Sequence, residues 1–233
     1  MMYCKLKSNQ VRSSKSLKCL KIESVWKQIN ESLKFHVHLL CNMHEADKLH
    51  HICKFICELG HLKRIKHEGW RLCGVANPES VAEHSLRAAQ IGYILAKLEG
   101  YEKPEEVCSI LVFHDIGECR IGDIHKVARR YIEADEERAV GEQTRNLDDI
   151  GKEILEKWKR IEEQKDRAGI IAKDADLLEM AFTAKEYMQT GFPAAGDWIE
   201  KISAKLQTDS AKKLIETLKE LNCIEWWQGL KKL

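Results

Sequence analysis

Proline, glycine and long apolar runs are scarce in this chain. Its 233 residues include only three prolines and 13 glycines, so few positions force a helix to break. Leucine, isoleucine, lysine, glutamate and alanine recur throughout, and these residues lose little on becoming helical. The composition therefore predicts a nearly all-helical protein. No apolar run reaches the ~20 residues of a membrane span, and no stretch has the order of a secretory signal, so we expect a cytoplasmic protein without a membrane partner.

A large net charge of either sign is lacking too. Lys and Arg total 38 against 37 acidic residues, a formal net charge of +1, and this balance argues against nucleic acid as a partner. The charge is unevenly spread, because residues 1–42 carry eight Lys or Arg against two Glu and are therefore +6. We predict a basic N-terminal extension over residues 1–42 and one folded domain over residues 43–233. We interpret the extension as a loosely attached segment ahead of Met43; a basic arm for RNA or membrane, or a targeting peptide, is the alternative.

The nine cysteines show no pairing pattern. Their number is odd and their spacing irregular, which predicts reduced thiols. His50, Cys53 and Cys57 share one face of a helix, but a single helix cannot surround an ion tetrahedrally, and no second pair has zinc-ribbon spacing. We therefore interpret Cys53 and Cys57 as small core residues and not as zinc ligands.

Apolar periodicity divides most of the chain into helices. The first predicted core helix starts at Asp47 and is ended by Gly69. A second helix runs from Asn77, its N-cap, to Gly100, and a third runs from Pro104 to Phe113. The later helices are two charged outer helices over 131–146 and 152–164, a core-crossing helix over 170–190 and an amphipathic helix over 198–221. Trp226 and Trp227 are expected to seal the core.

The strongest chemical signal is His114-Asp115 at the end of an apolar helix. A charged carboxylate there costs several kcal/mol unless it is paired or holds a cation. His84 on the preceding helix and Asp176 inside the core-crossing helix are its companions. Two imidazoles and two carboxylates suit a divalent ion such as Mn, Co, Fe, Zn or Mg. The alternative is structural: His84 as a hydrogen-bonded core histidine and Asp176 as the ion-pair partner of Lys173.

These residues resemble the HD-domain metal-dependent phosphohydrolases, whose motif is His, then His-Asp, then Asp. The match is closer to the HD-domain 5'-deoxynucleotidases. The matching blocks are Lys63-Arg64, Gly69-Trp70, Pro78 to Ser85, His114 to Cys119, Gly122 to Ile124 and Lys173 to Asp176. The resemblance covers about Asp47 to Tyr187, and it implies a compact all-α HD-domain bundle with a metal site at its centre.

The resemblance also implies roles for individual residues. The metal ligands would be His84, His114, Asp115 and Asp176, holding one divalent ion (Mn, Co, Mg or Zn). Glu118 would position or deprotonate the attacking water or protonate the leaving oxygen, although a surface glutamate is the structural alternative. Asp123 would serve in catalysis and, with Ile124, His125 and Lys126, in a loop that contacts the substrate nucleoside.

Two further expectations concern the sugar and the phosphate. Trp70 matches an aromatic residue that packs against the sugar and helps to select deoxyribose. Some family members have an Arg directly before this Trp, whereas this chain has Gly69, so the cation that meets the phosphate is open. Arg64, whose guanidinium can hold two phosphate oxygens, and Lys173 are the candidates. For Lys173, an ion pair that orients Asp174 or Asp176 is the alternative.

The function that follows is metal-dependent hydrolysis of (deoxy)nucleoside 5'-monophosphates to nucleoside and phosphate, in a homodimer. One alternative is a phosphodiesterase that cleaves a cyclic or oligonucleotide with the same metal site. The other is a regulatory protein that binds nucleotides without turnover. Glu118 and Asp123 discriminate between enzyme and regulator, because a binding module needs no acid-base carboxylates beside a complete ligand set.

Overall fold

The protein is all-helical. The structure, a computed structural model, describes residues 6–230, and every regular element in that range is a helix, as the composition predicts. The chain divides into two compact units, Met1–His51 and Ile52–Leu233. The basic extension predicted over residues 1–42 falls in the first unit, which α1 (Leu6–Leu59) largely forms, and its residues 1–5 lie outside the described part. Within residues 6–230, no helix combines the length and hydropathy that crossing a bilayer requires.

The first core helix ends ten residues earlier than the periodicity predicts. Short 3₁₀ helices, η1 (Gly60–Lys63) and η2 (Glu68–Cys73), follow α1. Before the helix ends, Phe55 is buried while Cys53 and Cys57 are exposed, so our interpretation of these cysteines as core residues is wrong. The two sets of residues lie on different faces of the helix. Phe55 and Leu59 pack in a cluster with Ile116, Val140 and Trp158, whereas residues 53 and 57 lie outside that face.

Helix α2 (Val81–Leu98) begins at a capping box. Ser80 Oγ accepts a hydrogen bond from the Glu83 amide, and the Glu83 carboxylate accepts one from the Ser80 amide at 2.6 Å. Ser80, and not Asn77, is therefore the N-cap. Gly92 lets α3 (Pro104–Val112) pack closely, because a Cβ at this position would overlap the side chain of Leu111.

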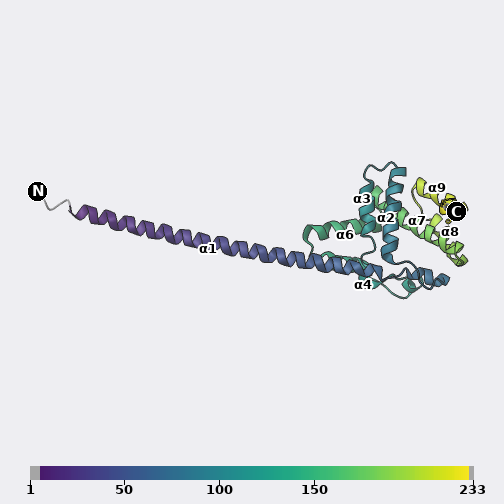
Figure 1. Cartoon of the computed structure of the whole chain (residues 1–233), viewed down its shortest axis with the longest axis horizontal. Helices are drawn as coiled ribbons and strands as arrows, with labels where there is room; N and C mark the ends of the chain where they lie inside the picture. The colour runs from purple at the N-terminus through teal and green to yellow at the C-terminus, as the bar shows by residue number, and fades with distance from the viewer. Residues whose placement is uncertain (1–5, 231–233) are drawn as a thin grey trace. The chain divides into compact units, whose positions relative to one another are not determined.

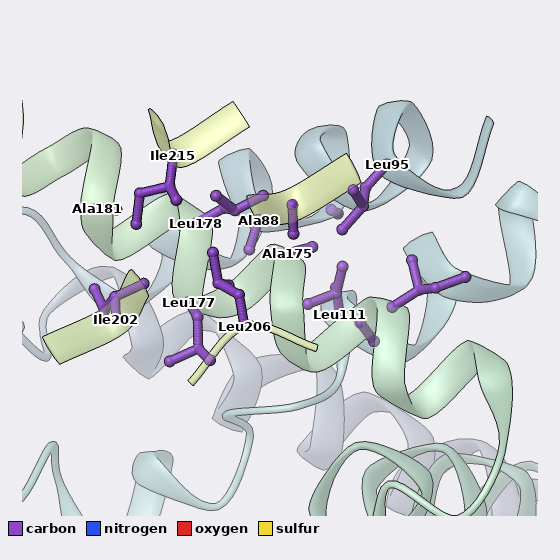
Figure 2. Packing of buried hydrophobic residues seen from close by; sticks show 14 of the residues in the cluster. Ala88, Leu95, Leu111, Ala175, Leu177, Leu178, Ala181, Ile202, Leu206 and Ile215 are labelled. Atoms are coloured by element: carbon purple, nitrogen blue, oxygen red, sulfur yellow. The ribbon is translucent and has the colours of Figure 1, made fainter. Parts of the chain in front are cut away.

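The main core lies between α2, α3 and α7 (Arg167–Gln189), which lie side by side in Figure 1. Figure 2 shows how α7 contributes to it from several sides of its circumference. The labelled residues are Ala88, Leu95, Leu111, Ala175, Leu177, Leu178, Ala181, Ile202, Leu206 and Ile215. Because α7 is buried on most of its surface, as its composition predicts, any carboxylate on its inner turns needs a partner.

The last predicted helix is two helices, α8 (Gly196–Ser203) and α9 (Asp209–Glu220). Between them the chain turns over the fully buried carboxylate of Asp174, which accepts hydrogen bonds from the amides of Gln207 and Thr208 and from the Thr208 hydroxyl at 2.6–3.1 Å. This carboxylate satisfies amides at the turn that would otherwise lack partners, which explains the break.

The remaining helices are α4 (Glu118–Ile121), η3 (Ala128–Arg130), α5 (Glu136–Thr144), α6 (Asp148–Glu163), η4 (Pro193–Ala195) and η5 (Glu225–Trp227). Helix α6 corresponds to the outer helix predicted over residues 152–164, but only one of its faces is exposed. Ile154, Trp158 and Ile161 on the opposite face are buried. Trp226 is 75% exposed and Trp227 is 38% exposed, so the expectation that they seal the core is wrong.

Candidate metal centre

Three helices bring the four predicted ligands together. His84 lies in the first turn of α2, His114 and Asp115 follow the end of α3, and Asp176 lies inside α7. His84 Nε2 is 3.3 Å from His114 Nε2 and 3.2 Å from Asp176 Oδ1. Asp115 Oδ2 lies 3.0 Å from His114 Nε2 and 3.6 Å from His84 Nε2. Donor atoms at these separations can share one ion at coordination distances of about 2.0–2.2 Å.

The second ring nitrogen of each histidine, Nδ1, makes a hydrogen bond to an oxygen outside the four predicted ligands. His84 Nδ1 donates to Glu179 Oε2 at 2.5 Å, and His114 Nδ1 donates to the carbonyl oxygen of Leu111 at 2.7 Å. A carbonyl or carboxylate oxygen only accepts hydrogen bonds, so the Nδ1 atoms carry the protons in both neutral rings. The two Nε2 lone pairs then face each other across 3.3 Å beside two carboxylates. This arrangement is unfavourable without a cation between the donors, and it fits a divalent metal.

The carboxylates create a strong preference for positive charge at this point. Burial disfavours charged imidazoles, but Asp115 and Asp176 outweigh it and raise the pKa of His114 to about 10. His84 behaves alike: Asp176 and Glu179 outweigh its burial and raise its pKa well above the usual value. Burial likewise opposes ionisation of Asp115, yet His114 and His84 lower its pKa to about 2. Without a cation, the raised pKa values of His84 and His114 favour protonated rings, and these protons supply the positive charge that a bound cation would supply instead.

Glu118 lies beside this cluster and is not a surface residue. It is 6% exposed at the start of α4, and its Oε2 atom has no hydrogen-bond partner among the described residues. Burial, together with the negative charges of Asp115, Asp123 and Glu136, raises the pKa of Glu118 to about 10. A buried carboxyl group with an unsatisfied oxygen next to a ligand set is a candidate for proton transfer.

Asp123 connects the loop after α4 to the segment that carries Trp70. Its Oδ2 accepts a hydrogen bond from the Glu68 amide at 2.6 Å. Trp70 is 2% exposed and packs between the rings of Tyr187 and Trp198, at centroid distances of 5.4 and 5.2 Å. The ring of Trp70 is therefore a rigid part of the core, and any contact with a sugar involves the small exposed part.

Of the other residues in the predicted substrate loop, Ile124 and His125 are half-buried, as Asp123 is, and Lys126 is exposed. Ile124 accepts a hydrogen bond at its carbonyl from Arg129 and lines a surface hollow of about 450 Å³ that includes none of the four predicted metal ligands. His125 Nδ1 accepts a hydrogen bond from the Ala128 amide at 3.1 Å, and Lys126 is exposed. Burial of part of the Lys126 side chain, with the positive charges of Lys205, Lys201 and Lys173 nearby, lowers its pKa.

The two cations considered for the phosphate differ in position. Arg64 is exposed after η1. Lys173 Nζ lies 2.8 Å from Asp176 Oδ2, so it reaches the cluster through an ion pair with a proposed ligand. Asp174, the other carboxylate considered for that ion pair, binds the turn between α8 and α9.

Two buried groups beside the cluster escaped the sequence analysis. Glu179 is fully buried, and His67 is 9% exposed, with its ring centroid 4.4 Å from that of His84. The position of Glu179, three residues after Asp176 on one helix, was a signal that could have found it, because residues three apart share a face. His67 had no such signal, since only the tertiary structure brings the segment before η2 against α2.

In this all-α bundle, three helices and the turn after α3 bring two imidazoles and two carboxylates to one point, where they could hold a metal ion. The comparisons with known proteins identify the protein's family. The sequence model described as HD domain matches residues 59–219, and the chain therefore belongs to the HD domain family. This confirms the resemblance found in the sequence.

Several curated relatives carry the name 5'-deoxynucleotidase. The 5'-deoxynucleotidase HDDC2 of Dictyostelium discoideum is 35% identical over 138 residues, which are 55% of this chain and 73% of that protein. The 5'-deoxynucleotidase HDDC2 of Bos taurus is 35% identical over 140 residues, 58% of this chain and 67% of the relative. A solved conserved hypothetical protein from Pyrococcus furiosus is 32% identical with a TM-score of 0.61, over 72% of this chain and 99% of its own.

Proposed function

We propose that this protein is a metal-dependent phosphohydrolase that converts deoxynucleoside 5'-monophosphates into nucleoside and phosphate. The observation that carries the proposal is the convergence of the Nε2 atoms of two imidazoles and two carboxylates beside the buried Glu118 carboxyl group. Relatives named 5'-deoxynucleotidase at 35% identity support the choice of substrate. We propose His84, His114, Asp115 and Asp176 as the ligands.

A divalent ion, when bound, withdraws charge from phosphoryl oxygens and lowers the pKa of bound water. The protein's own part is proton transfer and positioning, on which phosphoryl transfer depends. The positive charge of a bound ion would oppose the burial and the neighbouring carboxylates that raise the pKa of Glu118. Glu118 would then be ionised and would take the proton of the attacking water as the new P–O bond forms. It would then return a proton to the 5'-oxygen as the old P–O bond breaks, which leaves a neutral nucleoside hydroxyl.

Asp123 and Lys173 would act around this step. Asp123 holds the loop after α4 against the Glu68 amide, which limits the movement of that loop next to Glu118. Lys173 keeps Asp176 ionised through its 2.8 Å ion pair and adds positive charge near the phosphate. For Trp70, Arg64, Ile124, His125 and Lys126, a contact with the nucleotide remains a proposal that rests on the family resemblance, as do a homodimeric state and a cytoplasmic location.

The test is a panel of ribo- and deoxynucleoside monophosphates incubated with protein that has been stripped by a chelator and reloaded with Mn, Co, Mg or Zn. Phosphate release from deoxynucleoside monophosphates with at least one metal is expected, and none without metal. Cleavage of cyclic or oligonucleotides in place of monophosphates would favour the phosphodiesterase. Nucleotide binding without any release of phosphate would favour the regulatory protein.

A further inference from the structure

A chain of hydrogen bonds runs from the protein surface to the buried ring of the proposed ligand His84. It begins at Glu186, whose side chain is 43% exposed and whose two carboxylate oxygens lie 2.7 and 2.9 Å from Arg87 Nη1. Arg87 Nε donates to Glu179 Oε1 at 2.8 Å. The second oxygen of Glu179, Oε2, accepts from His84 Nδ1 at 2.5 Å. One guanidinium and one carboxylate thus connect the surface to a ring at the metal cluster.

Glu179 is held by more than one contact, so its carboxylate has a fixed orientation. Its side chain is 0% exposed, and the Thr183 hydroxyl lies 3.0 Å from Glu179 Oε1. Arg87 also donates to Thr183 Oγ1, so the guanidinium contacts both neighbours on α7. A buried carboxylate that lost its cation would be strongly destabilising. Arg87 therefore serves to keep Glu179 charged in the core.

We propose that Glu179, held in place by Arg87, is a positioning residue that fixes the tautomer and the ring orientation of His84 and thereby sets the affinity of the site for a divalent ion. When the ring of His84 is neutral, the carboxylate accepts the Nδ1 proton, so the lone pair lies on Nε2, which faces His114 and Asp176. Negative charge behind the ring also makes Nε2 a stronger donor to a cation. This inference rests on the ligand set of the proposed function, not on its substrate.

The same network reaches Trp70. Glu79 Oε1 lies 3.3 Å from Thr183 Oγ1 and accepts a hydrogen bond from Trp70 Nε1 at 3.4 Å. The proposed ligand His84 and the aromatic residue implied for the sugar are therefore joined by one set of polar contacts. A change at Arg87 is expected to affect both, whereas a change at Glu179 acts first on the ring of His84.

The test measures metal binding directly, without nucleotide. Chelator competition gives the dissociation constant of the full-length protein for Co²⁺ or Zn²⁺, and the visible absorption of bound Co²⁺ reports the ligand geometry. Glu179→Gln keeps the size of the side chain but removes the charge, and it offers an amide NH₂ group toward either His84 or Arg87. We expect metal affinity to fall about 10- to 100-fold with a changed Co²⁺ spectrum.

Matched variants separate positioning from folding. Asp174→Asn alters another fully buried carboxylate on α7 that binds the turn after α8, and it is expected to lower the melting temperature without changing the metal affinity of the folded protein. Glu186→Gln removes only the outer, part-exposed ion pair, so affinity should stay within about threefold of wild type. Arg87→Lys keeps the charge beside Glu179 and should bind metal more tightly than Arg87→Met.

Wild-type affinity and an unchanged Co²⁺ spectrum in Glu179→Gln would overturn the inference. An Asp174→Asn variant that weakens metal binding as much as Glu179→Gln would also overturn it, because the effect would then come from general loss of packing. If Glu179→Gln does not fold, Arg87→Met and Arg87→Lys decide: equal affinities would overturn the inference. These measurements include no nucleotide, so they test the inference even if the protein does not hydrolyse deoxynucleoside monophosphates.

Discussion

Glu118→Gln should change activity and stability in opposite directions. The substitution preserves the shape of a side chain that is 6% exposed and removes only its ability to take or give a proton. General acid-base catalysis typically contributes a factor of about 10² to 10⁴, or roughly 3 to 5 kcal/mol of barrier. With metal loaded, we expect kcat for deoxynucleoside monophosphates to fall by that factor, while metal affinity and KM stay close to wild type.

The effect on stability follows from the raised pKa of Glu118. In the metal-free protein this pKa is about 10 in place of 4.5, because of burial and the nearby charges of Asp115, Asp123 and Glu136. Between these two pH values the folded state holds a proton that the unfolded chain releases, so stability falls as pH rises above 4.5. At pH 7 the loss relative to pH 4 is about 3 kcal/mol at most, at 1.36 kcal/mol for each pH unit.

Glutamine does not titrate, so metal-free Glu118→Gln escapes this loss. Thermal unfolding at pH 4 and pH 7 measures the difference: relative to wild type, the variant should gain stability between the two pH values. For a domain of this size, about 3 kcal/mol corresponds to roughly 6–12 °C in melting temperature. A variant that hydrolyses deoxynucleoside monophosphates at the wild-type rate would refute the catalytic role, and Asp123 would become the next candidate. An equal stability difference at both pH values would refute the electrostatic argument.

Three further predictions concern the ligands and the assembly. Asp176→Ala should abolish metal binding in an elemental assay. Asp174→Ala should keep metal binding but lower the melting temperature, because the amides of Gln207 and Thr208 lose their acceptor. The reverse pattern would contradict the assignment of Asp176 as a ligand. Purified protein should contain about one divalent ion per chain, and two tightly bound ions would point to a two-metal diesterase. Light scattering should give the mass of a homodimer, with the exposed Trp226 and Leu230 as apolar surface available for contact; a monomer mass would contradict this.

Local sequence patterns were enough to predict the fold class and the family. Few helix-breaking residues and continuous apolar periodicity specify helices because both signals are local, and the elements α2, α3 and α7 follow directly from them. The His, His-Asp and Asp motif identified the family for the same reason, since side-chain chemistry at fixed spacing can be seen without coordinates.

Helix ends and side-chain exposure depend on contacts between segments that are distant in the sequence. The periodicity before Gly69 continues past the end of α1, and the chain turns where its side chains meet Ile116 and Trp158. The break between α8 and α9 depends on Asp174, which is distant in sequence from Gln207. The prediction that Cys53 is a core residue is wrong for the same reason. The local sequence shows that Cys53 is helical, but which face of that helix is buried depends on the segments that pack against it.

The surroundings of the metal centre also needed the tertiary structure. Glu179 and His67 carry no sequence motif of their own, and they matter only because α7 and the segment before η2 pack against His84. The pKa of Glu118 depends on its burial and on Asp115, Asp123 and Glu136, and only the packing of α5 brings Glu136 near it. Ligand identity is a property of residue type and order, whereas protonation, tautomer and orientation arise from contacts between distant segments, and only the folded chain contains those contacts.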